Sequence, residues 1–580
     1  MAMVKAIQKS FFKKIIDFLW KNRFLILVLV LSIPTFKGII RPGYFSMHDD
    51  MQAMRIYQMD KCFQDGQIPC RWVPDMGYQY GYPQFNYYGP LPYYVMEFFH
   101  LSGVNLFDSV KIGFILALLL GNVAMFVLGK SIWGKWGGVL SALLYAYAPY
   151  RAGDIYSRGA MGETWGFVFM PLILYSIYKL VHKPSIKNTG IFALSFAGLF
   201  ATHNITSFIF TPLAALWTIG LLISCKMNKQ KIVQFLKRFA LGSIWAMALS
   251  AFFLLPVIFE KSYAHIESML SGYFNYLAHF VNFKQLFFTT FWAYGSSVAG
   301  PHDDLSFFIG PIHLLIVGVI IALLVIKSIK KDSSFLNLKN KKLVLFICSL
   351  LALLISVFMT HSRSSFIWKT FSPLKYLQFP WRFLSPASFF ISFAGGYILS
   401  FSSVNKKITF LLLSLLIILF NSAFFTPKNW YNITPQEKFS GISYGRQLTI
   451  SIFDYLPIYA QYPPASVAPS HPTVINGSVG ITDYIKKSNK ITFNTNSKLP
   501  STILLNQFDF PGWVVKVNNK KVEHHHQNEL GLITFDLPSG INTVKVSLKN
   551  TPVRLLGDIL TLSSFSLLIY IFFKGKKNEK

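Results

Sequence analysis

The sequence predicts an all-α polytopic membrane protein of about 12 transmembrane helices, with a C-terminal extracytoplasmic β-sandwich-like domain before the last helix. Of the 580 residues, 53% are hydrophobic and only 14% are charged, whereas soluble domains carry about 25% charged residues. The net charge of +31 would suggest nucleic acid binding in a soluble protein. Here the excess Lys and Arg lie in short loops between apolar runs, where they set orientation in a bilayer. We therefore expect membrane lipids as partners and no nucleic acid.

A helix needs about 20 apolar residues to cross the hydrocarbon core. Runs near this length define the predicted spans: 23–40, 110–128, 136–150, 164–181, 190–203, 206–224, 239–259, 307–326, 343–360, 384–401, 408–425 and 555–573. The stretch 190–224 is either one long helix or two short ones that turn at His203 and Asn204. We predict two, because a single helix would move the basic loops 226–238 and 327–342 to the outside.

The basic flank of the first run predicts an uncleaved anchor with its N-terminus in the cytoplasm. Alternation of the spans then places both termini there and predicts a multi-pass membrane protein. Of the 24 acidic residues, all but Asp17, Asp332 and Glu579 fall on the outer side or in 426–553. This distribution favours chemistry or ligand binding at the outer face. The alternative is that the basic inner loops leave acids no other place.

Three predicted domains follow: a multi-span domain 1–425 with an outer loop 41–109, a β-rich extracytoplasmic domain 426–553, and the last helix with a basic tail, 554–580. The β-rich prediction depends on alternating runs at 490–496, 502–508, 513–517, 532–537 and 543–548, separated by Pro, Gly and Asn turns. His524, His525 and His526 could bind metal, but consecutive strand residues point to opposite faces. Among the four cysteines, only Cys62 and Cys70 lie close enough to pair.

The first outer loop has the most distinctive polar residues. His48, Asp49 and Asp50 precede apolar residues at helical intervals, which predict a short amphipathic helix along the membrane surface, with Arg55 in its first turns. The aspartates would lie at the bilayer boundary; the alternative is that they only cap this helix. The Tyr-rich segment 77–94 is typical both of an interfacial aromatic belt and of a rigid loop whose rings stack on sugars.

Two further outer segments combine charge with aromatic residues. In the second outer loop, Asp154, Arg158 and Glu163 form either a phosphate and acceptor site or an interfacial salt-bridge cluster. His203 and Asn204 could serve the site or only satisfy exposed backbone at their turn. Gln378 and Arg382 lie in a basic-aromatic turn, where Arg382 could hold a lipid phosphate or anchor to headgroups.

These segments together resemble a known group of proteins. The shared motifs are His-Asp-Asp at 48–50, Gly-Gln-Ile-Pro-x-Arg-Trp at 66–72, Tyr-Gly-Pro-Leu-Pro-Tyr at 88–93, Arg-Gly-Ala-Met-Gly-Glu at 158–163, Thr-His-Asn at 202–204 and Gln-Phe-Pro-Trp-Arg at 378–382. They resemble the bacterial membrane proteins with a 6-pyruvoyl-tetrahydropterin synthase-related domain. Phe-Pro-Gly-Trp at 510–513 and Pro-Ser-Gly at 538–540 look like the C-terminal part of YfhO-like proteins. No soluble catalytic domain or histidine zinc cluster suggests pterin chemistry.

The layout is also similar to the GT-C superfamily of integral-membrane glycosyltransferases, which use polyprenyl-phosphate-linked sugars. That resemblance implies a catalytic acid at Asp49 or Asp50, with Asp154 and Glu163 in the second contributing loop. The hypothesis is that Asp49 removes the acceptor proton while Arg158 and Arg382 stabilise the polyprenyl phosphate, with a divalent cation on Asp50 or Asp154 left open. The acceptor would be an envelope glycan, lipid or protein, and His48, Arg55, His203, Asn204 and Gln378 complete the candidate binding set. The alternative is a non-catalytic envelope scaffold or a transporter of lipid-linked glycan.

Overall fold

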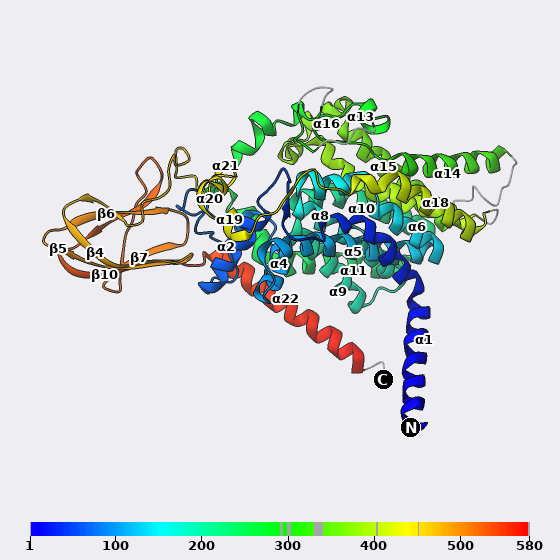
Figure 1. The fold of residues 1–580 in the computed structure, drawn as a ribbon, viewed down its shortest axis with the longest axis horizontal. Helices are drawn as coiled ribbons and strands as arrows, with labels where there is room; N and C mark the ends of the chain where they lie inside the picture. Colours follow the sequence, from blue (N-terminus) through cyan, green and yellow to red (C-terminus); the bar gives the residue numbers. More distant parts are fainter. Residues whose placement is uncertain are drawn as a thin grey trace.

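The computed structural model describes residues 2–289, 294–298, 303–329, 340–401, 404–450 and 452–577. A helical bundle forms most of the molecule, and a β-sandwich projects from one end of it (Figure 1). We call this end of the bundle the sandwich end. Asp332 and Glu579, two of the three acids predicted to be cytoplasmic, lie outside the described residues.

Within the described ranges, ten helical segments are long and apolar enough to cross a membrane. The helices in them are α1 (Ala2–Ser32), α5 (Leu106–Trp133), α8 (Met161–His182), α10 (Asn204–Cys225), α11 (Lys229–Leu249), α14 (Pro311–Ile329), α15 (Lys341–Thr360), α17 (Leu384–Gly395), α18 (Lys406–Asn421) and α22 (Pro552–Lys577). Short 3₁₀ turns extend α17 at both ends. The multi-pass membrane architecture predicted from the sequence is thus confirmed.

Four predicted spans differ from the observed helices. The span 239–259 is divided between α11, which ends at Leu249, and the short helix α12 (Ala251–Phe259). The spans 136–150 and 190–203 form α6 (Lys135–Ala146, 12 residues) and α9 (Ile186–Thr202, 17 residues), each shorter than an ordinary membrane helix. Two helices, α9 and α10, do form on either side of His203, as predicted. The first candidate span is Asp17–Thr35 rather than 23–40. Pro34 explains its early end, because the residue before a proline disfavours helical backbone and α1 stops at Ser32.

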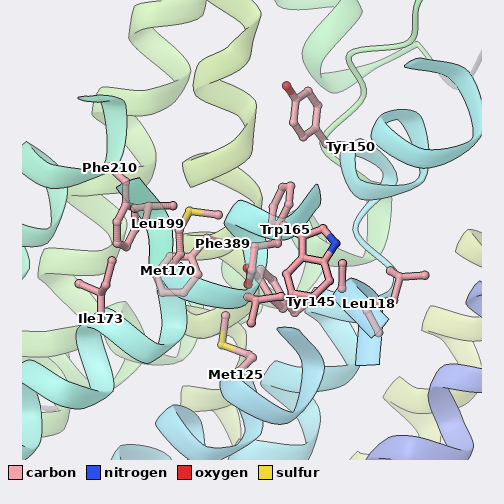
Figure 2. Close-up of a cluster of buried hydrophobic side chains, with 14 of the residues drawn as sticks. Leu118, Met125, Tyr145, Tyr150, Trp165, Met170, Ile173, Leu199, Phe210 and Phe389 are labelled. Atoms are coloured by element: carbon pink, nitrogen blue, oxygen red, sulfur yellow. The ribbon is translucent and has the colours of Figure 1, made fainter. Parts of the chain in front are cut away.

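The centre of the bundle is a continuous apolar core. Side chains from α5, α6, α8 and α17 meet there, among them Met125, Tyr145, Met170 and Phe389 (Figure 2). The Tyr145 hydroxyl donates to the carbonyl oxygen of Phe167 at 2.7 Å, so the buried phenol is satisfied. This packed core fixes the helix ends that carry the loops of the sandwich end.

Two antiparallel sheets form the sandwich. One has the strand order β4-β5-β10-β7-β8 and the other β3-β6-β9. Their bounds are β3 (Thr473–Asn476), β4 (Val479–Lys486), β5 (Lys490–Ser497), β6 (Ser501–Phe508), β7 (Trp513–Val517), β8 (Lys520–Val522), β9 (Leu532–Leu537) and β10 (Gly540–Leu548). Val544 pairs with Phe493 on one side and Val517 on the other, and all three side chains are buried. The five strands predicted from alternation therefore form, and β3, β4 and β8 were missed.

The first outer loop lies between the bundle and the sandwich. It contains α2 (Gln52–Gln64), α3 (Gln84–Tyr87) and α4 (Leu91–Leu101). Trp72 enters the sandwich core, with its ring 5.7 Å from that of Trp513, and β1 (Tyr44–Phe45) pairs with β2 (Trp430–Tyr431). A disulfide joins Cys62 to Cys70. The loop is therefore a packed structural element that ties the sandwich to the bundle.

Two expectations about this loop are wrong. Most of α2 is buried, including polar Gln52, Arg55 and Gln58, so the helix does not lie along a membrane surface. The Tyr-rich segment forms neither an exposed belt nor an open stacking platform. Tyr82 and Tyr93 are fully buried, and Tyr80 packs against Phe508 of the sandwich. The aromatic density serves the junction between the two parts of the molecule.

Candidate functional site

Backbone hydrogen bonds join the first two outer loops. The amides of His48 and Asp49 donate to the carbonyl oxygens of Ser157 and Arg158, both at 2.8 Å. The Gln52 side chain donates to the Gly159 carbonyl at 2.7 Å. Gly159 has a φ of +68°, and a Cβ atom there would contact the Met47 side chain. Only glycine suits this position, so the contact places Asp49 directly beside the second loop.

Asp49 is one of two partly open carboxylates at this junction, and Asp50 is the other. The Asp49 side chain is 32% exposed, while that of its partner Arg55 is 4% exposed. Arg55 Nη1 lies 2.9 Å from Asp49 Oδ2, and Gln52 Nε2 donates to the same oxygen at 3.0 Å. Tyr93 donates to Gln52 at 2.6 Å and thereby fixes the amide. Asp49 caps nothing, because Met51 is the N-cap of α2 and makes no side-chain cap. The capping alternative is thus excluded for both aspartates.

Asp50 makes a different contact from its neighbour. Its Oδ2 lies 2.6 Å from Nζ of Lys438, at the end of α19 (Pro435–Lys438). Burial raises the pKa of Asp50, and the charge of Lys438 opposes that effect. Lys438 also lies 5.4 Å from the ring centre of Tyr44. Asp50 therefore links the first outer loop to the segment that leads into the sandwich.

Asp154 and Glu163 share one arginine. Arg158 Nη1 forms ion pairs with both acids, at 2.7 Å to Glu163, and Tyr150 donates to the other Glu163 oxygen at 2.8 Å. The side chains of Asp154 and Glu163 are 0% and 1% exposed. Burial and the nearby charge of Glu163 raise the pKa of Asp154. Asp154, Arg158 and Glu163 therefore form a buried ionic cluster in which the acids compensate the charge of the arginine.

Arg382 lies in a 3₁₀ turn, Pro380–Phe383, before α17. Its Nη1 donates to the Leu377 carbonyl at 2.7 Å and to Gln378 Oε1 at 3.0 Å. Within the described part of the chain, no acid lies within ion-pair distance of its guanidinium. It nevertheless interacts electrostatically with Glu163. The adjacent Trp381 ring lies 4.6 Å from the Arg158 guanidinium, which brings this turn to the second loop.

His203 and Asn204 divide between the site and the scaffold. His203 caps α10 by accepting from the Thr206 amide, and it interacts electrostatically with Glu163 and Arg382. Burial lowers its pKa to about 4, so the ring is neutral at pH 7. Asn204 instead donates to the Tyr87 carbonyl at 3.4 Å and supports the first loop.

Tyr88 connects the open acid with the unpaired cation. The Arg55 guanidinium lies 4.2 Å from its ring centre. Burial raises the pKa of the Tyr88 hydroxyl. The charges of Arg55, Asp49 and Arg382 also act on this pKa. Asp49 and Arg382 therefore act on one neutral phenol although 333 positions separate them in the sequence. The structure thus brings His48, Asp49, Arg55, Arg158, Glu163, His203 and Arg382 into one electrostatically connected region.

Sequence reasoning missed Gln52, Tyr93, Tyr150 and Lys438. Gln52 follows Asp49 by three positions at a helix start, a spacing that could have suggested contact. No local signal could identify Lys438, because it lies 388 positions from Asp50. Among the described residues, no group of three or more His, Cys, Asp and Glu is arranged to hold a metal ion. His524 and His526 both contact Asp509, while His525 pairs with the backbone of Thr534.

Two cavities open near these loops. One, of about 390 Å³, lies between the end of α2 and the sandwich. The other, of about 670 Å³, is mainly apolar and is lined by residues 39–43, 105–115 and 433–436, with Arg41 and Lys111 among them.

Residues 85–427 match the family model of the 6-pyruvoyl-tetrahydropterin synthase related domain, described as a membrane protein. This match covers more than half of the chain. The chain belongs to this family. The family match confirms the resemblance carried by the loop motifs at 88–93, 158–163, 202–204 and 378–382, which all lie inside the matched range.

A protein from Lactococcus lactis subsp. cremoris (strain MG1363), described only as uncharacterized, is 25% identical over 259 residues. The match covers 43% of this chain and 41% of that protein. Among solved structures, arabinofuranosyltransferase AftD from Mycobacteria gives a TM-score of 0.43 at 12% identity, over 71% of this chain and 29% of that chain. The Archaeoglobus fulgidus oligosaccharyltransferase gives 0.40 at 13% identity, over 78% and 59%. The activity of this family member must therefore be argued from its own site.

Proposed function

We propose that the protein is a membrane glycosyltransferase that moves a hexosyl or pentosyl unit from a polyprenyl-phosphate donor to an envelope acceptor. One observation carries the proposal: the partly exposed Asp49 carboxylate and the Arg382 guanidinium, which has no acidic partner among the described residues, both act electrostatically on Tyr88. An acid and a cation at one place are the two groups that transfer from a phosphate leaving group needs.

The proposed reaction is balanced as follows. The acceptor hydroxyl oxygen forms a bond to the anomeric carbon, and its proton passes to Asp49. The bond from that carbon to the phosphate oxygen breaks, and the polyprenyl phosphate leaves with the electron pair. Arg382 stabilises the charge that develops on this phosphate. Arg55, Gln52 and Tyr93 orient the Asp49 carboxylate, since each belongs to its hydrogen-bond network.

The contacts of Arg158 change the role that the sequence suggests for it. Arg158 was expected to stabilise the phosphate together with Arg382. In the structure Arg158 is shared by Asp154 and Glu163, so its charge is already compensated. We therefore assign the phosphate contact to Arg382 and a positioning role to Arg158, whose carbonyl holds the Asp49 amide.

The proposed reaction takes place on the non-cytoplasmic face of a bacterial inner membrane, with both termini cytoplasmic. The Cys62–Cys70 disulfide supports this placement, because structural disulfides persist in oxidising compartments. The concentration of basic residues in the predicted inner loops supports the same orientation.

The test is release of polyprenyl phosphate by the purified full-length protein incubated with polyprenyl-phosphate sugars extracted from the producing membranes. Asp49→Asn should lower the rate about 10²- to 10⁴-fold, because the variant keeps the shape but not the basic carboxylate. Asp49→Glu should recover part of the rate. Asp108→Asn is the matched control, since Asp108 is a half-exposed acid at the start of α5 and, among the described residues, pairs with Lys111 and Asn105.

An Asp49→Asn rate equal to wild type would overturn the assignment of the base. Absence of polyprenyl phosphate release by the wild type itself would favour the non-catalytic scaffold. A disulfide that stays reduced in cells, measured by thiol labelling of Cys62 and Cys70, would contradict the placement on the outer face.

A further inference from the structure

The cavity of about 390 Å³ has walls from two distant parts of the chain. The first outer loop supplies Lys61, Gln64 and Asp75, and the sandwich supplies Tyr484 and Lys486. Its volume lies within the range of about 300–1,000 Å³ that is usual for ligand clefts. Neither the family match, which begins at residue 85 and ends at 427, nor the proposed chemistry at Asp49 accounts for it.

The cavity presents charged and polar groups that already have hydrogen-bond or ion-pair partners. Lys61 pairs with Asp75 at 2.5 Å. Lys486 donates to the carbonyl oxygens of Gln79 and Asn506 at 2.7 and 2.9 Å. Such a lining offers many donors and acceptors to a hydroxyl-rich ligand. Lys486, which has no acid within ion-pair distance among the described residues, is held by the two carbonyl oxygens.

Two side chains in the cavity wall indicate a ligand with hydroxyl groups. Ser488 is 1% exposed, and its Oγ has no hydrogen-bond partner in the described part of the chain. A buried hydroxyl without a partner is costly, so a ligand group that reached it from the cavity would be stabilised. Tyr484 adds an aromatic ring to the wall, and burial raises its pKa to about 12, so its phenol remains a donor. A ring beside several planar polar groups suits a sugar.

Helix α2 connects this cavity with the candidate catalytic acid. Asp49 lies just before the helix, and Lys61 and Gln64 lie near its C-terminal end. At about 1.5 Å per residue, the helix rises roughly 13 Å from Gln52 to Lys61. A ligand in contact with both places would be longer than one sugar residue.

We infer that this cavity binds a sugar residue of an extended glycan acceptor, remote from the hydroxyl that reacts at Asp49. The inference rests on the proposed function, because it assigns the acceptor class of that reaction. It predicts that the protein binds oligosaccharides better than monosaccharides. It also predicts that glycan binding does not need the catalytic carboxylate.

The test uses the full-length protein in detergent and, as probe, fluorescently labelled oligosaccharides released from the envelope of the producing cells and fractionated by length. Two cavity variants report on binding. Tyr484→Ala removes the aromatic wall, and Ser470→Trp fills the cavity from an exposed position on its rim. Each should weaken binding of the longer fractions about tenfold or more.

Matched controls separate this effect from damage to the sandwich. Tyr462→Ala and Ser466→Trp make the same exchanges at exposed positions outside the cavity lining. Both should bind like wild type. Thermal unfolding should agree for Ser470→Trp and Ser466→Trp, whereas Tyr484→Ala should be less stable than Tyr462→Ala because Tyr484 packs against Phe493. Asp49→Asn should also bind like wild type while it fails to turn over.

Each outcome decides one of the two proposals. Equal binding by the cavity variants and their controls, or no retention of any fraction by the wild type, would overturn the glycan site. Loss of binding in the cavity variants together with full turnover by Asp49→Asn would support the glycan site and overturn the catalytic assignment. A preference for monosaccharides over longer fractions would overturn the extended acceptor.

Discussion

Asp49 and the Asp154–Arg158–Glu163 cluster lie side by side, yet their electrostatics differ. Asp49 has an arginine of its own and is 32% exposed. Asp154 and Glu163 share one arginine and are at most 1% exposed. An acid that must receive a proton from a substrate needs access, whereas a buried shared ion pair fixes the backbone around it. The difference assigns chemistry to the first cluster and positioning to the second.

The contact between the clusters explains why both are needed. The Arg158 carbonyl accepts from the Asp49 amide, while its guanidinium compensates the two buried acids. Arg158 therefore connects the buried charges to the open carboxylate without touching it. Substitutions in the second cluster should reduce stability first, and substitutions around Asp49 should reduce activity first.

The largest effect is expected for Arg158→Gln. It leaves Asp154 and Glu163 buried without a cation, which costs about 3–5 kcal/mol of unfolding free energy. Denaturation of the purified protein in detergent measures this loss. The control is Arg446→Gln, because Arg446 is exposed on α20 (Gly441–Gln447) and forms no ion pair within the described residues.

A second substitution sharpens this prediction. Glu163→Gln in the Arg158→Gln background removes the uncompensated charge, since burial raises the pKa of Asp154, and should restore part of the lost stability. An Arg158→Gln variant as stable as wild type would show that the buried acids are not charged in the native state, and the comparison of the two clusters would fail.

The next effect is expected for Arg382→Gln. Removing a cation that faces developing charge lowers a rate about 10²- to 10³-fold. Arg382→Lys should retain part of the rate, because it keeps the charge but not the planar geometry. Arg41→Gln, at the rim of the apolar cavity, is the matched control. A greater loss in the Arg41 variant than in the Arg382 variant would move the phosphate to that cavity.

The sequence allowed the elements to be predicted, but not the contacts between them. Apolar runs of helical length predicted the bundle, and alternation predicted five strands of the sandwich, because both patterns are local. The loop motifs also predicted which residues gather at the site, since the charged residues stood out among apolar neighbours. Their roles at the site stay predictions.

The predictions that were wrong concern residues whose environment depends on tertiary packing. The Tyr-rich segment was expected to be open, but its rings fill the junction with a sandwich more than 350 positions away. The Asp50–Lys438 pair could not be predicted for the same reason. Asp49 pairs with Arg55, six positions away, whereas Asp50 pairs with Lys438, 388 positions away. Because the second contact is long-range, the sequence could not separate the roles of the two aspartates.

The comparison extends to a third buried acid, which forms no ion pair with a cation among the described residues. Glu97 on α4 is 0% exposed, and neither of its carboxylate oxygens has a hydrogen-bond partner in the described ranges. Burial, with the nearby charge of Asp60, raises its pKa to about 8. An unfolded glutamate has a pKa of about 4.3. Between these values only the native state holds the proton, so the free energy of unfolding should fall as pH rises from about 5 to about 8, by roughly 3–4 kcal/mol.

Glu97→Gln should remove most of this pH dependence, because the amide does not titrate. Thermal unfolding at several pH values between these limits measures it. Asp536→Asn, an exposed acid of β9, is the control and should follow the wild-type profile. Equal slopes for wild type and Glu97→Gln would show that Glu97 does not titrate in this window.

The smallest effect is expected at Asp50, the partly buried neighbour of the catalytic candidate. A double-mutant cycle with Asp50→Asn and Lys438→Gln should give a coupling energy of about 1 kcal/mol in stability, because the pair is only partly shielded from solvent. Asp50→Asn should retain most of the activity that Asp49→Asn loses. Lys438 neutralises the carboxylate that a divalent cation would otherwise bind, so added Mg²⁺ should affect only the Lys438→Gln variant. Strong Mg²⁺ dependence of the wild type, reversed by EDTA, would instead give Asp50 a catalytic role and remove the distinction between the two adjacent aspartates.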